Sequence, residues 1–364
     1  MPPFTEILSA ADGLSHGDAW RDLARRAEEP DPFAEIGFVG PASRRLARAR
    51  ALRIALVWRG PERLLLLAAV VLQPPTLGLG FARVWRCEQA ALGAATFDRE
   101  AIAPALQAFV GALGSAYPFA AGLVIPRVAT DGALARAARA LGGDRFAAFS
   151  PLRRAAFEIG GEAEPGAKRR KEWARLERRL AERGTLENRV FADEAAFERF
   201  LALEAKGWKG ARRTALNAAP ERAAFAREMA AAFLEAGRLR VHELALDGEP
   251  VASGVELRAG PRAFFWKIAH DEAFAAYSPG VLLTRALSRR LVEEGEVGLI
   301  DSCAAPDHPM IDRVWPGRLE FCDIAIPLGA APLFSSLLAW ERAAPRLRQR
   351  MKQVVLPLLG RKRS

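Results

Sequence analysis

Apolar and polar residues alternate along residues 238–246 and 250–258, on either side of a short polar break. Alternation with a period of two is typical of strands with one buried face, and the Asp247-Gly248 pair between them favours a tight hairpin turn. Arg262 to Ala269 continues as a third segment rich in aromatic residues. The pattern therefore predicts a three-stranded antiparallel meander in the second half of the chain.

A helix and a further strand are predicted after the meander. Apolar side chains recur at helical spacing from Val281 to Glu294. Ser278 is a good N-cap, Pro279 suits the first helical position because its missing N–H is no loss there, and Gly295 is a typical stop. A strand from Val297 to Cys303 would complete a right-handed strand-helix-strand crossover.

The start of this helix is a candidate anion site. Unpaired N–H groups and the helix dipole favour negative charge at a helix N-terminus, and Gly280 keeps side-chain bulk away from them. The pyrophosphate of a nucleotide suits such a site. A capped helix start is by itself more often purely structural, so the prediction depends on its context. The predicted cofactor-binding residues are Ser278, Pro279, Gly280, Val281, Leu282 and Thr284.

The first 160 residues alternate strands and helices, which indicates an α/β unit. The predicted strands are Leu52 to Trp58, Arg63 to Leu72, Phe81 to Cys87, Ala121 to Ile125 and Arg153 to Ile159, and the predicted helices are Asp18 to Glu29, Ser43 to Arg50, Arg99 to Leu113 and Asp131 to Leu141. Gly160 to Gly166 has the composition of a linker. We expect domains at residues 1–160 and 167–330, followed by a basic amphipathic tail at residues 331–364.

The second half opens with a strongly basic helix, Lys168 to Arg183, which carries three apolar residues on one stripe. Two interpretations are open. The helix is either a solvated face that docks by its stripe, or a surface that contacts an anion such as a CoA phosphate, an acidic acceptor or RNA. Further helices are predicted from Ala195 to Gly207 and from Pro220 to Gly237, and a last strand from Phe321 to Ile326.

Three separated blocks of the second half together resemble one family. They are LEAKGWKGARRTAL (203–216), KIAHDEAFAAYSPGVLL (267–283) and DSCAAPDHPMIDRVW (301–315). In this order they resemble the CelD-like family of GNAT acyltransferases, whose relatives include the Fem-type peptidyltransferases. The resemblance covers residues 168 to 327 or so.

The resemblance implies a GNAT fold, a mixed sheet of the α/β (α+β) class in which two neighbouring strands splay apart to admit the pantetheine arm of a donor. It implies acetyl-CoA or another acyl-CoA as the cofactor. Because relatives have doubled domains, it also implies two GNAT-like domains in tandem, with a degenerate one at residues 1–160. One departure concerns the phosphate loop, which in this family has Arg or Gln followed by spaced glycines, whereas Tyr277 to Leu282 keeps only Gly280.

Acyl transfer to an amine requires an oriented thioester and a base that removes a proton from the ammonium group. Glu256, on the middle meander strand, and Asp271, in the loop after the next strand, are candidate bases. Tyr277 is a candidate acid for the leaving thiolate, or a residue that packs against the cofactor. Lys267 is a further catalytic candidate; alternatively it points outward or pairs with Asp271 or Asp301, because an unpaired buried lysine is costly.

Other candidates lie in loops. Asp301 and His308 follow the second core strand, at the carboxyl edge where open α/β sheets bind ligands, and are catalytic candidates. Trp208 and Lys209 suit a loop that closes over a substrate, or one that the tryptophan anchors in the core. The predicted substrate-binding residues are Trp208, Lys209, Trp266 and Cys303. The histidines form no cluster with metal-ligand spacing, so no metal site is expected.

Composition adds the setting. A chain of 364 residues with 51% hydrophobic residues is long enough for two domains, each with its own core. The N-terminus lacks the features of a signal peptide, and the longest apolar run, Leu64 to Leu72, is too short to span a bilayer, so a cytoplasmic location is expected. Three cysteines without a CxxC pair indicate reduced thiols.

The net charge of +10 is concentrated in two segments. Residues 341–364 carry +7 and residues 168–183 carry +5, which leaves the rest of the chain slightly acidic. This distribution argues against a DNA-binding body. The basic tail repeats apolar positions, and it either lies on an anionic membrane surface or docks on the body or on a second subunit.

Taken together, these observations predict an N-acyltransferase that moves an acetyl or longer acyl group from acyl-CoA to an amine of a small molecule or sugar. The resemblance suggests a role in polysaccharide or cell-envelope metabolism. One alternative is a Fem-like transferase that uses aminoacyl-tRNA. The other is a catalytically silent scaffold of an envelope assembly, attached through the tail.

Overall fold

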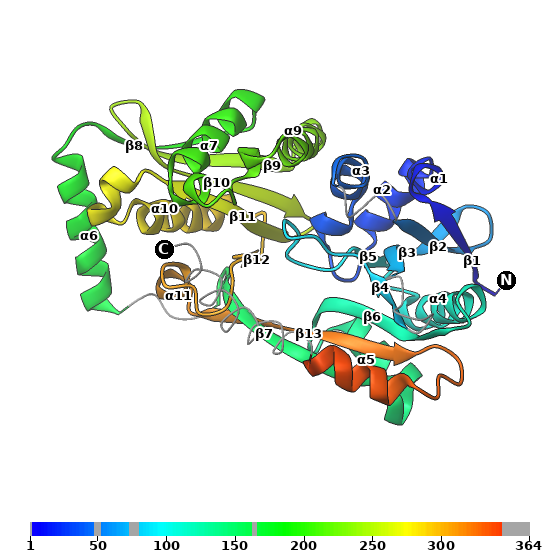
Figure 1. Ribbon diagram of the computed structural model, residues 1–364. Coiled ribbons are helices and arrows are strands. Elements are labelled where there is room, and N and C mark those ends of the chain that lie inside the picture. Colours follow the sequence, from blue (N-terminus) through cyan, green and yellow to red (C-terminus); the bar gives the residue numbers. More distant parts are fainter. Residues whose placement is uncertain (1, 47–51, 73–79, 162–165, 344–364) are drawn as a thin grey trace, which may run out of the picture.

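The computed structural model describes residues 2–46, 52–72, 80–161 and 166–343. Its strands form one mixed sheet in the order β1-β2-β3-β4-β6-β13-β7-β12-β11-β10-β9-β8, with β5 paired to β3. Figure 1 shows β1 near one end of this sheet and β8 at the other, with helices on both faces. The predicted mixed α/β architecture is confirmed.

The first half of the chain builds one side of the sheet. Its strands are β1 (Phe4–Ser9), β2 (Arg53–Arg59), β3 (Arg63–Leu72), β4 (Gly80–Val84), β5 (Ala95–Phe97), β6 (Ala120–Ala129) and β7 (Ala147–Glu158). Its helices are α1 (Ala10–Leu14), α2 (Gly17–Arg25), α3 (Ile36–Arg45), α4 (Ile102–Ala116) and α5 (Ala133–Gly142), with short 3-10 turns η1 (Pro32–Ala34) and η4 (Gly143–Arg145). The segment predicted as a helix from Ser43 to Arg50 is helical up to Arg45, but its start is wrong, because α3 begins seven residues earlier and holds Pro41 in its interior; residues 47–50 lie outside the described ranges.

The second half builds the other side. Its strands are β8 (Leu186–Phe191), β9 (Leu239–Leu246), β10 (Glu249–Ala259), β11 (Arg262–His270), β12 (Leu299–Asp301) and β13 (Gly317–Pro327). Its helices are α6 (Ala167–Ala181), α7 (Glu194–Lys206), α8 (Trp208–Ala211), α9 (Pro220–Glu235), α10 (Pro279–Glu294) and α11 (Ile311–Val314), with 3-10 turns η5 (Leu216–Ala218) and η6 (Glu272–Tyr277). The predicted meander is confirmed as β9-β10-β11, with positive φ angles at Asp247 and Gly248 in its first turn.

The strand order is symmetric about the boundary between β13 and β7. Counted inward from each end of the sheet, β1 corresponds to β8, β2 to β9, β3 to β10, β4 to β11, β6 to β12 and β13 to β7. The parallel pairs β4–β6 and β11–β12 occupy equivalent places. The two halves therefore repeat one topology, as the doubled-domain resemblance implies.

The two halves also exchange their last strands. β13 lies between β6 and β7 of the first half, and β7 in turn pairs with β12 of the second half. Each half thus completes the other's sheet. The division into residues 1–160 and 167–330 stays a prediction, since it describes the chain and not the exchanged strands.

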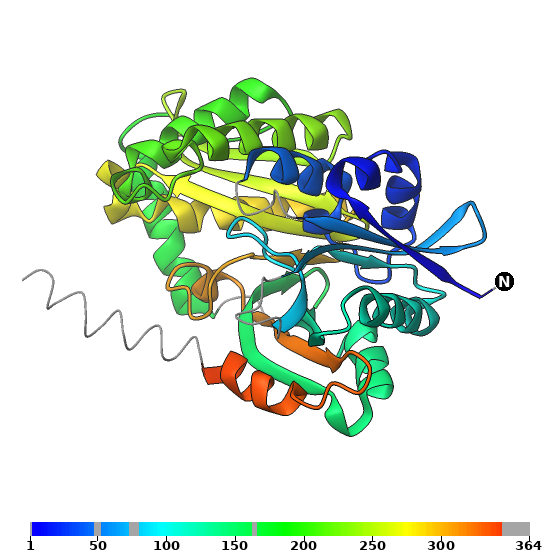
Figure 2. The same ribbon diagram turned by 45° about the vertical axis from the view of Figure 1, so that its right-hand side comes forward.

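One face of the sheet carries a core that is continuous across both halves. Helices α2 and α3 of the first half and α7 and α9 of the second pack into it, and both figures show them on the same side (Figures 1 and 2). Phe38 of α3 meets Phe225 of α9 edge to face, with ring centroids 5.2 Å apart. Apolar burial of this kind is the main stabilising term in such an interface.

The opposite face carries separate clusters. Helices α4 and α5 cover the first half, and α6, α10 and α11 cover the second. Residues 334–343 are helical and insert Phe334 and Leu338 among side chains of β4, β6, β7 and β13. The start of the predicted tail therefore docks on the body, whereas residues 344–364 lie outside the described ranges. Among the described helices, none has the length and apolarity to cross a bilayer.

Candidate active site

Strands β11 and β12 separate at the centre of the second half. They pair in parallel only from Arg262 to Phe264 against Leu299 to Asp301, after which β11 runs on to His270 without that neighbour. The strand predicted to reach Cys303 accordingly ends at Asp301. The ladder between the two strands ends because β12 ends at Asp301, at the place where the resemblance implies a splay.

The start of α10 lies in the predicted place but is built differently. Pro279 is its first residue, as predicted, while Ser278 adopts a left-handed conformation with φ 51° and ψ 53°. The Ser278 side chain makes no cap bond; instead its carbonyl oxygen accepts from the N–H groups of Val281 (2.9 Å) and Leu282 (3.3 Å). A non-glycine residue in this region is unusual and is often found at functional sites.

A cavity of about 260 Å³ opens at this helix start. It is lined by His270, Ala275, Ser278, Pro279, Gly280, Val281, Pro309, Met310 and Arg313. A Cβ atom at Gly280 would lie 2.7 Å from the Met310 Sδ, so a side chain there requires Met310 to move. The helix dipole and the Arg313 guanidinium both favour an anion in this cavity.

Two predicted cofactor-binding residues lie away from the cavity. Leu282 is 4% exposed and belongs to the core beneath α10. Thr284 is fully buried and donates its hydroxyl hydrogen to the Gly280 carbonyl at 2.8 Å. Both therefore support the helix start from the core side, while the other four line the cavity.

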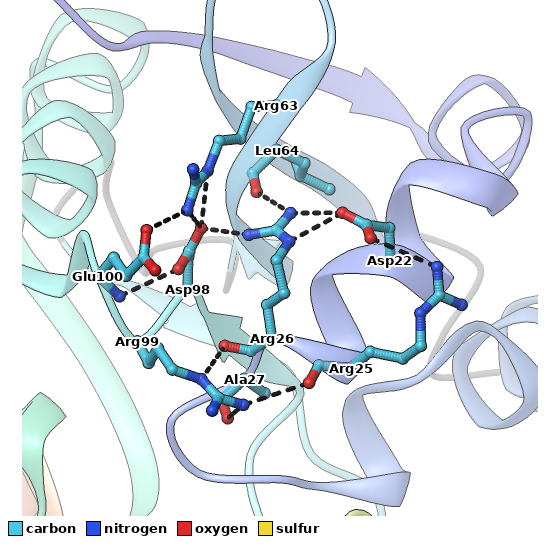
Figure 3. A network of polar contacts seen from close by, with 9 residues as sticks. All are labelled: Asp22, Arg25, Arg26, Ala27, Arg63, Leu64, Asp98, Arg99 and Glu100. Atoms are coloured by element: carbon cyan, nitrogen blue, oxygen red, sulfur yellow. Dashed lines mark hydrogen bonds and ion pairs between the residues drawn. The ribbon is translucent and has the colours of Figure 1, made fainter.

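The equivalent helix start in the first half is acidic. Helix α4 connects the parallel strands β4 and β6 as α10 connects β11 and β12, and its first turn follows Asp98 and Glu100. Figure 3 shows the buried Asp98 carboxylate accepting from Arg26 and Arg63, with Arg63 also bonded to Glu100 at 2.6 Å. Ion pairs occupy this position, so of these two equivalent helix starts that of α10 is the one that favours an anion.

Glu256 lies far from the cavity. Its fully buried carboxylate bonds to the His242 ring at 2.6 Å and to the Arg258 Nε at 2.6 Å. Burial alone would raise the pKa of Glu256, but these two partners lower it overall. Arg258 also bonds to Glu294 at the last residue of α10. Because α10 has 16 residues, about 24 Å separate its two ends, so the structure does not bring Glu256 to the predicted site.

Asp271 belongs to a clamp that joins α7 and α8 to the loop after β11. Lys206 bonds to the Asp271 carboxylate at 2.6 Å, and the backbone N–H of Trp208 donates to the Glu272 carboxylate at 2.6 Å. The hydrogen bond from Lys206 lowers the pKa of Asp271. A carboxylate held in this way is a weak base. The Trp208 indole is 48% exposed beside this clamp, and Arg212 lies over it.

Lys209 and Glu204 form a second link to the same strand. The Lys209 Nζ donates to the Glu204 carboxylate (3.0 Å) and to the Ile268 carbonyl oxygen (2.8 Å). Glu204 is 2% exposed and also accepts from the Leu216 N–H. Glu204 was not predicted as a site residue, although a charged residue four positions after Phe200, on the apolar face of a helix, indicates a buried carboxylate that needs partners.

Lys267 is largely buried on the part of β11 that has left β12. Burial lowers the pKa of Lys267, and the nearby Glu204 carboxylate opposes that shift only in part. The partners expected for it are taken: Asp271 pairs with Lys206, and Asp301 pairs with Arg154. The Lys267 Nζ bonds to no acceptor within the described ranges, and it lies 5.6 Å from the Trp266 ring centroid.

The remaining predicted residues divide into buried supports and residues near the cavity. Asp301 is 2% exposed and bonds to Arg154 and to the Cys303 N–H, so it orders the turn after β12. Burial raises the pKa of the Cys303 thiol. Trp266 is 5% exposed, and its indole N–H donates to the Gln89 carbonyl in the other half of the chain. Asp301, Cys303 and Trp266 therefore lie among structural contacts.

His308 and Tyr277 flank the cavity. The His308 Nδ1 lies 3.4 Å from the Ile311 N–H, and partial burial lowers the pKa of His308, which favours a neutral ring. Tyr277 packs near Phe274, with the Arg179 guanidinium 5.6 Å from its ring centroid. No group of three potential metal ligands occurs in the described part of the chain.

Comparison with known proteins agrees with this geometry. Residues 167–308 match a family model described as an acetyltransferase (GNAT) domain. That range holds β8 to β12, α10 and the cavity-lining residues from His270 to Val281. No curated protein sequence matches the chain.

Solved structures share the fold over nearly the whole chain. FemX is 12% identical, with a TM-score of 0.58 over 88% of this chain and 98% of its own. L-PGS from Bacillus licheniformis is 10% identical, with a TM-score of 0.54 over 89% and 96%. The chain therefore has a GNAT fold, as expected, and residues 167–308 match a GNAT acetyltransferase domain, whereas the narrower CelD-like resemblance stays a prediction.

Proposed function

We propose that the protein is an N-acyltransferase that transfers an acetyl or longer acyl group from acyl-CoA to the amine of a small molecule or sugar. The observation that carries this proposal is the cavity at the start of α10, beside the point where β11 and β12 separate. An anion-favouring helix start and a gap between parallel strands match the two parts of a CoA thioester, its pyrophosphate and its pantetheine arm.

Ser278, Pro279, Gly280 and Val281 would hold the pyrophosphate, with Arg313 as its counter-charge. The absence of a side chain at Gly280 leaves room for Met310 against the helix start. The acyl-CoA supplies an activated carbonyl carbon when it is bound. The protein then has to orient that carbon and accept one proton from the acceptor's ammonium group.

Lys267 is the proton acceptor that the described residues favour. Its pKa is lowered by burial, its amine bonds to no acceptor in the ranges described, and it lies on the diverging part of β11. With an acyl-CoA bound, the freed amine nitrogen would form the amide bond to the thioester carbon as the C–S bond breaks, and the second proton of that nitrogen would pass to the leaving thiolate. His308 supplies a ring N–H donor near the cavity, and Tyr277 is the second candidate for the proton returned to sulfur.

The acceptor would approach from the side of Trp208. The backbone N–H of Trp208 donates to Glu272, which holds this residue and its exposed indole at the loop after β11. The adjacent Gly207 lies near the carbonyl oxygen of His270, a residue that lines the cavity. Lys209 is tied to Glu204 and Ile268 and so positions this corner. An aromatic ring held at the mouth of a site provides a flat contact for a sugar or other small amine.

A Fem-like reaction with aminoacyl-tRNA is the second candidate, and α6 favours it. Its apolar stripe, Trp173, Leu176 and Leu180, is buried as expected, while its Arg169 bonds to the carbonyl of Arg313 at 3.0 Å. Basic side chains of α6 therefore lie beside the cavity. A long nucleic acid would use more of this surface than CoA does.

A direct assay separates these functions. We expect release of free CoA from acetyl-CoA when amino sugars or small amines are added, with loss of most turnover in Lys267→Met. Charged tRNA as the only productive donor would favour the second candidate. A folded protein that binds neither donor would favour a scaffold.

The cellular setting is also proposed. A cytoplasmic enzyme of polysaccharide or envelope metabolism fits an acyl-CoA donor, and contact with an anionic membrane would involve the basic residues after 343. Truncation after residue 343 keeps the docked helix that contains Phe334 and Leu338. Loss of membrane association with transfer intact would make the tail an accessory; loss of both would tie it to the reaction.

A further inference from the structure

Arginines gather at the carboxyl end of the first half's parallel strands. β4 and β6 pair with Arg83 opposite Val124. Arg86 follows the end of β4 by two residues, and Arg127 lies near the end of β6. Open α/β sheets bind ligands at such carboxyl ends. This is the symmetric counterpart of the place where β11 and β12 diverge beside the donor cavity.

The backbone at Arg127 is specially shaped. Arg127 has a φ of 56°, and its N–H donates to the Asp323 carboxylate at 3.0 Å. The register of β13 shifts at Asp323 against β6 and at the preceding residue, Cys322, against β7, and Ser150 on β7 also has a positive φ, of 51°. Bulges of this type redirect a side chain, and they are frequent next to active sites.

The charge at this point is poorly neutralised. The Arg127 guanidinium is half-buried and bonds to no acceptor among the described residues, while the Arg86 guanidinium bonds only to the Ala90 carbonyl. Burial lowers the pKa of Arg127, and the positive charges of Arg86 and Arg154 lower it further. Asp323 is the acid that acts against this repulsion.

Arg154 connects the cluster to the other half. It is 3% exposed, bonds to Asp301 at 2.5 Å and to the Ala91 carbonyl at 3.1 Å, and lies over the ring of Phe321. Its Nε is buried without a hydrogen-bond partner. A buried donor left unpaired and like charges brought together both cost free energy unless a ligand compensates them.

We propose that Arg86, Arg127 and Arg154 form a binding site for an oxyanion, the carboxylate or phosphate group of the acceptor. This inference rests on the proposed transferase function, since it names the acceptor as an amine that also carries an anionic group. Arg127 and Arg86 present N–H donors to the anion, and Arg154 adds its positive charge and its unpaired Nε next to the Asp301 turn. Guanidinium groups suit this task because their planar donors match carboxylate and phosphate oxygens.

The test uses inorganic phosphate with the full chain, with sodium chloride at equal ionic strength as reference. Phosphate should raise the melting temperature of the wild type above that reference, and Arg127→Gln should weaken phosphate binding about tenfold or more. Arg127→Gln keeps the backbone bond to Asp323. Arg153→Gln is the matched control, because Arg153 is adjacent to Arg154 in β7 but is exposed in a loose pair with Glu320.

A second readout separates a ligand site from a structural role. Without phosphate, Arg127→Gln should be at least as stable as the wild type, because it removes a half-buried, unneutralised charge; a structural arginine would give the opposite result. Arg86→Gln, at an exposed side chain, provides the same test of binding if Arg127→Gln fails to fold. No phosphate effect in the wild type, or equal effects in the wild type and both variants, would overturn the site.

Two further arms identify the source of the anion and isolate the inference. Glycerol 3-phosphate and glutamate represent soluble acceptors, and phosphatidylglycerol vesicles, compared with phosphatidylcholine vesicles, represent a lipid headgroup. The arm whose binding Arg127→Gln weakens names the source; equal binding of each by wild type and variant would overturn the acceptor assignment. Acetyl-CoA should stabilise Arg127→Gln as it does the wild type, so a failure of the donor hypothesis remains distinguishable.

Discussion

Arg154 and Asp301 form an ion pair of 2.5 Å in which both side chains are only 3% exposed. Arg154 belongs to β7 and Asp301 to β12, so the pair joins the two halves where they exchange strands. Removal of one partner leaves the other charge buried and unpaired. We expect Asp301→Asn to lower the free energy of unfolding by about 3–5 kcal/mol in denaturant titrations.

The exposed pair of Arg153 and Glu320 provides the control for this prediction, since Arg153 is next to Arg154 on β7 and pairs at 3.5 Å with Glu320 on the neighbouring strand β13. Glu320→Gln should change stability by less than about 1 kcal/mol, because exposed ion pairs contribute little. Equal effects of Asp301→Asn and Glu320→Gln would contradict a structural role for the buried pair.

Glu256 should prove to be a structural acid. Its pKa is lowered by His242 and Arg258 against the effect of burial, so its contribution to stability is present above the unfolded pKa and is lost as the pH falls through the lower folded pKa. We expect the wild type to lose stability below about pH 4.5, its reference value, more steeply than Glu256→Gln. Thermal unfolding across that range measures the difference.

At neutral pH, Glu256→Gln should be less stable than the wild type yet retain turnover while folded, since Glu256 lies at the far end of α10 from the cavity. A folded Glu256→Gln protein with normal donor binding and no transfer would instead restore Glu256 as a candidate base.

Lys267 should destabilise the fold in its charged form, the reverse of Glu256, although the lowered pKa of each group makes stability rise with pH. Burial lowers its pKa, so the charged form destabilises the fold, and stability should rise with pH through the alkaline range toward the unfolded value near 10.5. Lys267→Met should remove this rise and be at least as stable as the wild type at neutral pH, while turnover falls. If Lys267→Met transfers the acyl group at the wild-type rate, the proposed proton acceptor is wrong.

Trp208 should act on the acceptor and hardly on the fold. Its indole is 48% exposed, so Trp208→Ala should change the free energy of unfolding by less than about 0.5 kcal/mol. Loss of an aromatic contact of about 1–2 kcal/mol predicts a rise of about five- to thirtyfold in the KM for the amine, with the KM for the donor unchanged. Trp340→Ala, at another exposed tryptophan, is the control, and equal kinetics of the two variants would refute a role in acceptor binding.

Local signals in the sequence located helix α10 correctly. Pro279 and Gly295 mark the observed start and end of α10 because each acts through its own backbone, without help from distant residues. The meander could be predicted for the same reason, since the turn at Asp247 and Gly248 and the alternation of apolar residues are both features of the local sequence.

The errors have a shared cause in long-range structure. The bulge between Val255 and Glu256 and the bonds of Arg258 to the end of α10 place Glu256 far from the cavity, and neither is encoded by spacing along the chain. The exchange of β7 and β13 likewise depends on pairing between residues more than 150 positions apart. Ser278 adopts a left-handed conformation and its side chain caps no N–H group, which residue type alone does not reveal.

The central claim is that an acyl-CoA binds at the start of α10. The most direct test is the thermal stability of the purified protein with acetyl-CoA and longer acyl-CoAs, comparing the wild type with Gly280→Asp and with Val292→Asp. The last variant puts the same charge at an exposed position near the other end of α10. Gly280→Asp also displaces Met310, so its stability without donor is measured first.

The account predicts that an acyl-CoA stabilises the wild type and Val292→Asp, by about 3 kcal/mol at a hundredfold excess over its Kd, and does not stabilise folded Gly280→Asp. The acyl length that gives the largest shift would identify the preferred donor. No shift with any CoA ester in the folded wild type, or an equal shift in Gly280→Asp, would contradict the account.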